Sequence, residues 1–347
     1  MPLFLKNAIT FDDVLLVPQY SDISSRKNVS IATALFGTPL GVPICSANMD
    51  TITEFDMAWE MDALGGFGIL HRYAPHDVIC HWIHSLKKLN ARNIIPSIGI
   101  KSSDVALALH YAELGITGIT VDIAHGDSKH MVEMIHHLKS ANLKVIAGNV
   151  ASYDGALRLA DAGADVIKVG IGGGSMCTTR IVTGHGVPQL SAIEECAKIK
   201  RLYPHVGIIA DGGIRNSGDC VKALAFGADI CMVGSLLAGT QQTPGCVIEK
   251  RDSLGKMHKV KQYRGMASAE ARGSFVVIDS SYTAEGVATT VPYKGSASSV
   301  INQLIGGISS GLSYSGAKTL KELRDNSEYV FVTGSSLAES KPHGLKS

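Results

Sequence analysis

The sequence lacks both a strong net charge and a long hydrophobic run. Its 347 residues carry 32 Lys and Arg against 31 Asp and Glu, a formal net charge of +1, so its charge does not indicate binding to nucleic acid or to a membrane surface. No apolar run is long enough to span a bilayer. Residues 1–10 also lack the basic and apolar segments of a secretory signal. These absences predict a cytoplasmic protein whose partners are small molecules.

Paired cysteines and metal-binding motifs are also missing. The seven cysteines are scattered, and no two of them have the spacing of a zinc site. We therefore expect reduced thiols. The 13 histidines form no HExxH motif, and the 37 glycines form no repeat, which indicates many tight loops rather than a low-complexity chain.

Eight short apolar runs recur along the chain with helix-like segments between them. The runs are nearly continuous and rich in β-branched residues, as expected for parallel strands buried on both faces. They cover Gly41–Asn48, Phe67–Arg72, Ile94–Ile100, Gly118–His125, Val145–Val150, Val166–Gly172, Gly207–Gly213 and Asp229–Ser235. This alternation predicts an α/β fold, a (β/α)8 TIM barrel. A doubly wound open sheet is less favoured because no GxGxxG motif follows the first strand.

We expect one barrel domain over residues 1–347, with a lid inserted after the eighth strand. The insertion covers about residues 240–295 and contains a charged run, Glu249–Lys261, that predicts a solvated hairpin. Helices are predicted over Ser298–Ser309 and Tyr314–Arg324. The polar tail, about 335–347, is predicted to be loose.

One cysteine lies in a glycine-rich loop after the sixth strand, where residues 169–180 read VGIGGGSMCTTR. Such a loop exposes backbone groups to a ligand, and Cys177 beside polar and cationic groups is a candidate nucleophile. The alternative is an unreactive, half-buried thiol. Thr179 could relay a proton, most effectively with a carboxylate beside it. Glu285 in the lid is the candidate carboxylate, although sequence spacing alone favours an exposed loop acid.

Polar residues and glycines follow the seventh and eighth strands, where barrels often bind phosphate through backbone N–H groups. Asp211 could accept hydrogen bonds from ribose hydroxyls, or it could cap a helix. Ser175 could add a phosphate donor. The predicted ligand is a phosphorylated nucleoside whose base lies within reach of Cys177. The phosphate-binding candidates after the two strands are Gly212, Gly213, Gly234 and Ser235.

The order of these motifs resembles the IMP dehydrogenase / GMP reductase family. The resemblance runs from about Thr10 to about Arg324. Gly173 departs from it, because the family usually has proline there. The motifs that carry it are the cysteine loop Gly170–Arg180, Ala47–Asp50, Ala147–Val150, Ala210–Ile214 and Tyr263–Met266.

The resemblance implies a barrel that is usually a homotetramer and a covalent thioimidate between Cys177 and C2 of a purine monophosphate, GMP or IMP. It implies Cys177, Thr179 and Glu285 as catalytic residues. Loop carbonyls of Gly172, Gly174 and Cys177 would hold K+. The substrate would contact Ser175, Asp211, Gly212, Gly213, Gly234, Ser235, Gly265, Met266, Ala267 and Gly286. The cofactor, NADPH, would contact Ser25, Arg26, Arg72, Asp122, Ala124, Asn149 and Gly172.

Two reactions in this family share the thioimidate, and three features favour the reductase, which converts GMP to IMP with NADPH and releases ammonia. No CBS regulatory domain follows the second strand. The lid has no Arg-Tyr pair to activate water. Asp122–Gly126 resembles the reductase loop, and Ser25-Arg26 resembles its 2′-phosphate contact.

Other features of the sequence keep alternatives open. Gln262–Met266 and Gly186–Gln189 resemble the dehydrogenase. The alternative is therefore an IMP dehydrogenase without the regulatory domain, which would form XMP and NADH from IMP, NAD and water. A non-catalytic nucleotide sensor and a flavin-dependent barrel oxidoreductase are alternatives from other classes.

Overall fold

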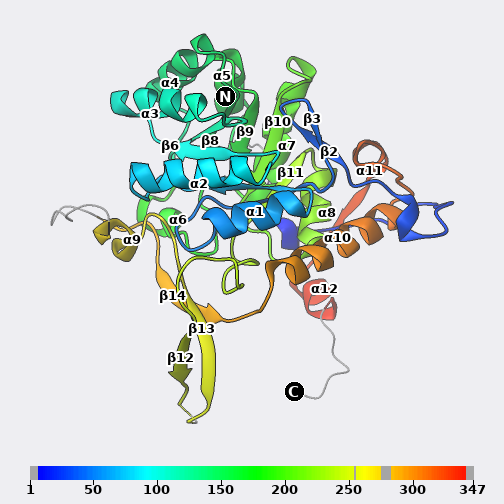
Figure 1. The fold of residues 1–347 in the computed structure, drawn as a ribbon. Coiled ribbons are helices and arrows are strands. Elements are labelled where there is room, and N and C mark those ends of the chain that lie inside the picture. Colours follow the sequence, from blue (N-terminus) through cyan, green and yellow to red (C-terminus); the bar gives the residue numbers. More distant parts are fainter. Residues whose placement is uncertain (1–6, 254, 275–282, 341–347) are drawn as a thin grey trace.

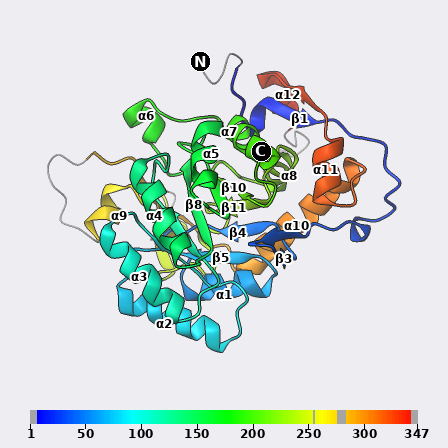
Figure 2. The ribbon, with the colours of Figure 1, turned by 90° about the horizontal axis from the view of Figure 1, so that it is seen from above.

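Eight parallel strands close into a barrel at the centre of the molecule (Figure 2). The computed structural model describes residues 7–253, 255–274 and 283–340. Each predicted apolar run contains one barrel strand, so the TIM barrel is confirmed. Neighbours in the chain are neighbours in the barrel, and β11 pairs with β4 to close it. The strands are β4 (Ile44–Ser46), β5 (Phe67–Leu70), β6 (Ile95–Ile98), β7 (Ile119–Asp122), β8 (Val145–Val150), β9 (Val166–Val169), β10 (Gly207–Asp211) and β11 (Ile230–Val233).

Amphipathic helices cover the outside of the barrel. In α2, Ile79, Ile83 and Leu86 are buried at helical spacing, so one face packs on the strands. Helix α5 is followed by Gly163, whose φ of 100° reverses the chain into the next strand. These helices are α1 (Phe55–Ala63), α2 (His76–Lys88), α3 (Ser102–Glu113), α4 (Lys129–Ser140), α5 (Tyr153–Asp161), α7 (Gln189–Ala197), α8 (Ser217–Ala225) and α10 (Ala297–Tyr314). The short helix α6 (Thr179–Thr183) follows the glycine-rich loop after β9 and has no buried residue.

The connection after the second barrel strand is short. Strand β5 ends at Leu70, α2 begins at His76, and the next strand begins at Ile95. This connection holds no regulatory domain, as predicted. Within the described residues, none of the helices combines the length and the apolar character that a membrane crossing needs.

The predicted lid is a flap between β11 and α10 that projects from one end of the barrel (Figure 1). Its strands β12 (Ile248–Arg251), β13 (Met257–Arg264) and β14 (Ala288–Pro292) form an antiparallel sheet, and α9 (Ala269–Gly273) lies between β13 and β14 in the chain. The predicted hairpin is confirmed, but it is not solvated throughout. Lys261 is buried, and its ammonium donates to the carbonyl of Thr240 at 3.2 Å. Residues 275–282 of the predicted lid lie outside the described residues.

The chain termini add short elements beside the barrel. Strand β1 (Val14–Leu16) pairs with β15 (Tyr329–Phe331), and β2 (Thr33–Leu35) pairs with β3 (Thr38–Leu40). The helix predicted over Tyr314–Arg324 is wrong, because α10 ends at Tyr314 and α11 covers Leu320–Asn326. Gly316, with φ of 60°, breaks the two helices apart. Part of the tail predicted to be loose lies in α12 (Gly334–Glu339), and residues 341–347 lie outside the described residues.

Alanine substitutions at two adjacent glycines of α10 are expected to change the stability of the protein in opposite directions. A methyl group on Gly307 would lie 2.0 Å from Oγ and 2.2 Å from Cβ of Ser217 in α8, whereas one on Gly306 would meet nothing within 4 Å. We expect Gly307→Ala to lower the free energy of unfolding by about 1–3 kcal/mol through overpacking. Gly306→Ala should raise it by about 0.5–1 kcal/mol, because alanine favours the helix. Urea unfolding of both variants checks this, and equal effects would contradict the close approach of α10 to α8.

Candidate active site

A cavity of about 730 Å³ lies at the carboxyl ends of the barrel strands, beneath the flap. Loops after five of the eight strands, β4, β5, β7, β9 and β10, contribute to its wall, together with Asn149 of β8, Met232 of β11 and flap residues around Met266 and Glu285. This is the end of a barrel at which ligand chemistry is expected. Sixteen of the predicted site residues line the cavity: Arg72, Asp122, Ala124, Asn149, Gly172, Gly174, Ser175, Cys177, Thr179, Asp211, Gly212, Gly265, Met266, Ala267, Glu285 and Gly286.

Cys177 begins a chain of polar contacts that ends on a carboxylate. Its Sγ donates to Oγ1 of Thr179 at 3.1 Å, and that hydroxyl donates to Oε2 of Glu285 at 2.8 Å. All three side chains are partly buried. A thiol, a hydroxyl and a carboxylate in line can move a proton between a sulfur-bound ligand and the carboxylate. Glu285 is therefore not the exposed loop acid that its sequence spacing favours.

Backbone contacts hold the flap against the cysteine loop. Thr178 donates its N–H to the carbonyl of Glu285 at 2.9 Å, and Val287 donates to Met176 at 3.1 Å. Between these two bonds, Cys177 and Gly286 form an isolated antiparallel bridge. These main-chain hydrogen bonds hold the flap so that the Glu285 carboxylate lies beside Thr179.

A buried lysine, which the sequence analysis missed, lies under the cavity. Lys168 in β9 is 3% exposed, and its Nζ contacts Oδ1 of Asp122 at 2.8 Å and Oδ2 of Asp211 at 2.6 Å. Burial alone would lower the pKa of Lys168, but the two carboxylates raise it above the ordinary value. Burial would likewise raise the pKa of Asp122, and the ammonium lowers it by more, so the net pKa is depressed. Both groups are therefore charged at neutral pH.

Asp211 is held in the cavity wall rather than at a helix end. Its Oδ2 also accepts from Nδ2 of Asn149 at 2.9 Å. The cap of the following helix, α8, is Asn216, whose side chain accepts from the N–H of Asp219. The helix-cap interpretation of Asp211 is therefore wrong, and Lys168 and Asn149 orient its carboxylate toward the space beside the cysteine loop.

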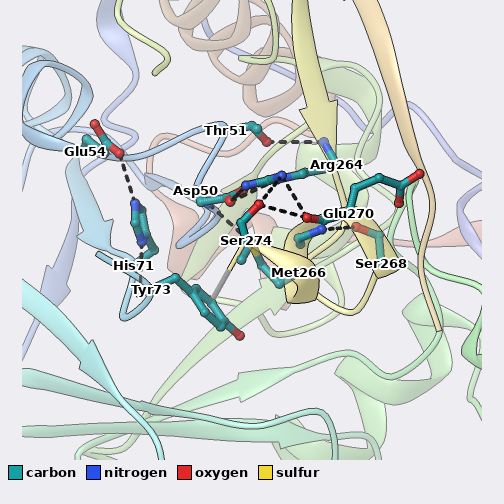
Figure 3. A network of polar contacts seen from close by, with 11 residues as sticks. Asp50, Thr51, Glu54, His71, Tyr73, Arg264, Met266, Ser268, Glu270 and Ser274 are labelled. Carbon is teal, nitrogen blue, oxygen red and sulfur yellow. Dashed lines mark hydrogen bonds and ion pairs between the residues drawn. The ribbon is translucent and has the colours of Figure 1, made fainter. Parts of the chain in front are cut away.

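An ion pair anchors the flap to the loop after the first barrel strand (Figure 3). Arg264, at the end of β13, binds Asp50 through Nε and Nη2, and its Nε–Oδ2 distance is 3.0 Å. Its backbone N–H donates to Oγ1 of Thr51 at 3.3 Å. Beside this pair, the N–H of Asp50 contacts Sδ of Met266 at 3.3 Å. The pair sets the position of the Gly265–Ala267 turn in the cavity wall.

Five predicted site residues are not in the cavity lining. Ser25 and Arg26 lie at the exposed helical turn η2 (Arg26–Asn28), which packs against α10. Within a single chain these two residues are therefore not part of the cavity wall. Gly213 and Gly234 border the lining. A methyl group on Gly213 would lie 3.6 Å from the carbonyl oxygen of Gly173, and one on Gly234 would lie 3.6 Å from the hydroxyl of Tyr263. Ser235 accepts from Nζ of Lys294 through its carbonyl.

The glycine loop after β9 owes its shape to a close approach of two main chains. Gly170 has a φ of 148°, and a Cβ there would lie 1.9 Å from the carbonyl oxygen of Asp211, so only glycine fits. Gly173, the departure from the resembled motif, is different. Its nearest atom to a built Cβ is Oε1 of Gln189 at 3.4 Å, which leaves space for a side chain.

Comparison with known proteins assigns the family. A model described as "IMP dehydrogenase / GMP reductase domain" matches residues 8–343. This chain belongs to that family. It is an oxidoreductase family of purine metabolism, and the family residues quoted from the sequence, apart from Ser25 and Arg26, lie at or beside one cavity of this barrel.

Two relatives and one solved structure define the likeness within the family. Inosine-5′-monophosphate dehydrogenase of Nitrosopumilus maritimus is 34% identical over 98% of this chain and 99% of its own. The enzyme of the same name from Cryptosporidium parvum is 36% identical over 97% of this chain and 95% of its own. An alanine-for-cysteine variant of GMP reductase from Trypanosoma brucei, in complex with guanosine 5′-monophosphate, superimposes with a TM-score of 0.91 at 30% identity, covering 99% of both chains.

Proposed function

We propose that this protein is a GMP reductase that converts GMP, NADPH and a proton to IMP, NADP+ and ammonia in purine salvage. The observation that carries the proposal is the contact chain from Cys177 through Thr179 to Glu285. It gives a nucleophile and a path for the proton that a departing amino group needs. The Trypanosoma brucei relative, crystallised with GMP, supports a guanine nucleotide as the ligand of this fold.

In this mechanism, the Cys177 thiolate attacks C2 of the guanine ring and forms a carbon–sulfur bond. The thiol proton passes by Thr179 toward Glu285, and the same path returns a proton to the exocyclic amino group as the C2–N bond breaks. Ammonia leaves, and a thioimidate remains on Cys177. Reduction at C2 then breaks the carbon–sulfur bond, and the sulfur departs as thiolate with IMP as the product.

The remaining cavity residues are proposed to hold the nucleotide. Oδ2 of Asp211 is bound by Lys168 and Asn149, which leaves Oδ1 to accept a ribose hydroxyl. Ser175, whose hydroxyl is 2.9 Å from that of Tyr263, would contact the phosphate. The phosphate would also meet backbone N–H groups of Gly212, Gly213, Gly234 and Ser235. Gly265, Met266, Ala267 and Gly286 would hold the base.

The residues present fit a nicotinamide dinucleotide and a monovalent cation. Arg72, Asp122, Ala124, Asn149 and Gly172 line the cavity beside the cysteine loop, and the guanidinium of Arg72 suits a cofactor phosphate. NADPH would supply the hydride for C2. The carbonyls of Gly172, Gly174 and Cys177 are proposed to hold K+. Gly174 already accepts from Cys177 N–H at 3.1 Å, but a carbonyl oxygen has a second lone pair. We also propose a homotetramer in the cytoplasm.

Dehydrogenation of IMP is the second candidate, because the curated relatives described above are IMP dehydrogenases. That reaction must hydrolyse the thioimidate, and so it needs a group that activates water. In the sequence from Gly265 to Glu285 no arginine is followed by tyrosine. Without such a pair, we infer that the intermediate is reduced rather than hydrolysed.

A spectrophotometric assay of the full chain in K+ buffer tests the two reactions. We expect NADPH absorbance to fall when GMP is added, with IMP and ammonia formed in equal amounts. We expect no NADH from IMP and NAD. Accumulation of XMP with NADH would instead establish the dehydrogenase. Nucleotide binding without either reaction would establish a sensor, and a flavin spectrum of the pure protein would contradict both proposals.

A further inference from the structure

A cluster of two histidines and a cysteine lies on helices that surround the barrel, and none of the three residues lines the cavity. His76 and Cys80 are one turn apart on α2, so both side chains lie on the same face. His110 comes from the last turn of α3. Potential ligand atoms of the three side chains all lie within 4.8 Å of one another. None of the three takes part in the proposed reaction.

The spacing of the cluster is close to that of a tetrahedral metal site. Zinc bonds of about 2.3 Å to sulfur and 2.0–2.1 Å to nitrogen place ligand atoms about 3.3–3.6 Å apart. Sγ of Cys80 lies 3.6 Å from Nε2 of His76. The rings of His76 and His110 are tilted against each other, with centroids 5.2 Å apart. The other spacings between potential ligand atoms are at most 4.8 Å, so rotation of the His110 side chain would be needed to close the set.

Polar neighbours orient both imidazoles for this role. Nδ1 of His110 contacts Oε2 of Glu113 at 3.4 Å. Nδ1 of His76 lies 3.2 Å from the hydroxyl of Tyr111, which is buried. A histidine that ligates a metal through one nitrogen usually donates the other N–H to a carboxylate or another oxygen, which fixes its tautomer. In both rings this pattern leaves Nε2 for the metal.

We propose that His76, Cys80 and His110 form a site for a divalent transition metal, with Zn²⁺ as the natural ion and water as the fourth ligand. Two imidazoles and one thiolate form a donor set that suits Zn²⁺ and disfavours Mg²⁺ and Ca²⁺, which prefer oxygen. Because the ligands come from two helices, the ion would join α2 to α3 on the wall of the barrel. Binding releases the Cys80 proton to solvent and breaks no covalent bond other than S–H.

Titration of the chelator-stripped, reduced full chain with Co²⁺ tests the site. Tetrahedral Co²⁺ gives visible ligand-field bands, and a thiolate ligand adds a charge-transfer band in the near ultraviolet. We expect both bands to saturate at one equivalent per chain and to disappear when Zn²⁺ is added. Zn²⁺ should also raise the melting temperature.

Variants separate this site from the other thiols. Cys80→Ser and His110→Ala should remove the charge-transfer band or weaken Co²⁺ binding by at least about 100-fold, and Glu113→Gln should weaken it about 10–100-fold. His84→Ala on the exposed face of α2, Cys246→Ser in the flap and Cys177→Ser should leave the spectrum unchanged. Circular dichroism of each metal-free variant confirms folding. An unchanged spectrum in Cys80→Ser, or no thiolate band at one equivalent of Co²⁺, would overturn the proposal.

Discussion

Cys177→Ala is expected to lower turnover of GMP by at least about 10⁴-fold, because no covalent intermediate can form without the sulfur. Nucleotide binding should persist. The cavity wall does not depend on Sγ, and the contact between Thr179 and Glu285 does not pass through it. The two measurements are steady-state NADPH oxidation with GMP and calorimetric titration of the variant with GMP.

The matched control is Cys246→Ser, which removes an exposed thiol of the flap and should keep the turnover of the unmodified protein. Mass spectrometry of unmodified protein trapped with GMP should find one nucleotide adduct, on the peptide that contains Cys177. Turnover by Cys177→Ala within about tenfold of the unmodified protein, or an adduct on a different thiol, would contradict covalent catalysis at this residue.

The barrel could be predicted from the sequence because its signal is local. A strand such as Ile230–Val233 is apolar throughout, since parallel strands are buried on both faces, and every barrel strand except β11 has a helix as its next element. Strand ends were less certain. The run Gly41–Asn48 contains a strand of only three residues, Ile44–Ser46. The apolar run is longer than the strand because apolar loop residues on either side of it are also buried.

The candidate nucleophile Cys177 and its neighbour Thr179 could be predicted for the same reason, whereas Glu285 could be named as a candidate but its contact with Thr179 could not be predicted. Thr179 is close in sequence, whereas Glu285 reaches it across 106 residues through main-chain bonds of the flap. Sequence spacing contains no information about such a contact. The same applies to Arg264 and Asp50, 214 residues apart.

Lys168 left a signal that the sequence analysis did not use. It is a lysine inside the strand Val166–Val169, where every other residue is apolar. A charge at such a position is buried, and a buried charge needs partners. Asp122 and Asp211, at the ends of two other strands, meet this need, so the lysine indicated where carboxylates would converge.

Replacing this lysine should produce the largest stability change of the variants considered. Lys168→Met leaves Asp122 and Asp211 without their shared cation, and removing one partner from a buried ion pair typically costs about 3–5 kcal/mol. We expect the free energy of unfolding at pH 7 to fall by that amount. GMP turnover should fall with it, because Asp211 would no longer be held beside the cysteine loop. Urea unfolding and NADPH oxidation measure the two effects.

The destabilisation should depend on pH in a defined direction. In the unmodified protein the ammonium lowers the pKa of Asp122 despite the opposing effect of burial, so its contribution to stability is present above the unfolded pKa of about 3.9 and is lost as the pH falls through the lower folded value. In Lys168→Met, burial acts on this carboxyl against only the smaller effects of Arg72 and Asn48, so we expect its folded pKa to rise above about 3.9. The variant should therefore lose stability as the pH rises from about 4 toward 7, and the difference between the two proteins should widen over that interval.

The control is Lys144→Met, which removes a half-exposed lysine that contacts Asp165 at 3.3 Å. Solvent screens this pair, so the free energy of unfolding should change by less than about 1 kcal/mol, with little dependence on pH. A Lys168→Met variant as stable as Lys144→Met, or a difference from the unmodified protein that narrows between pH 4 and 7, would show that the two aspartates do not depend on Lys168. In that case the cavity wall would have to keep Asp211 in place through Asn149 alone.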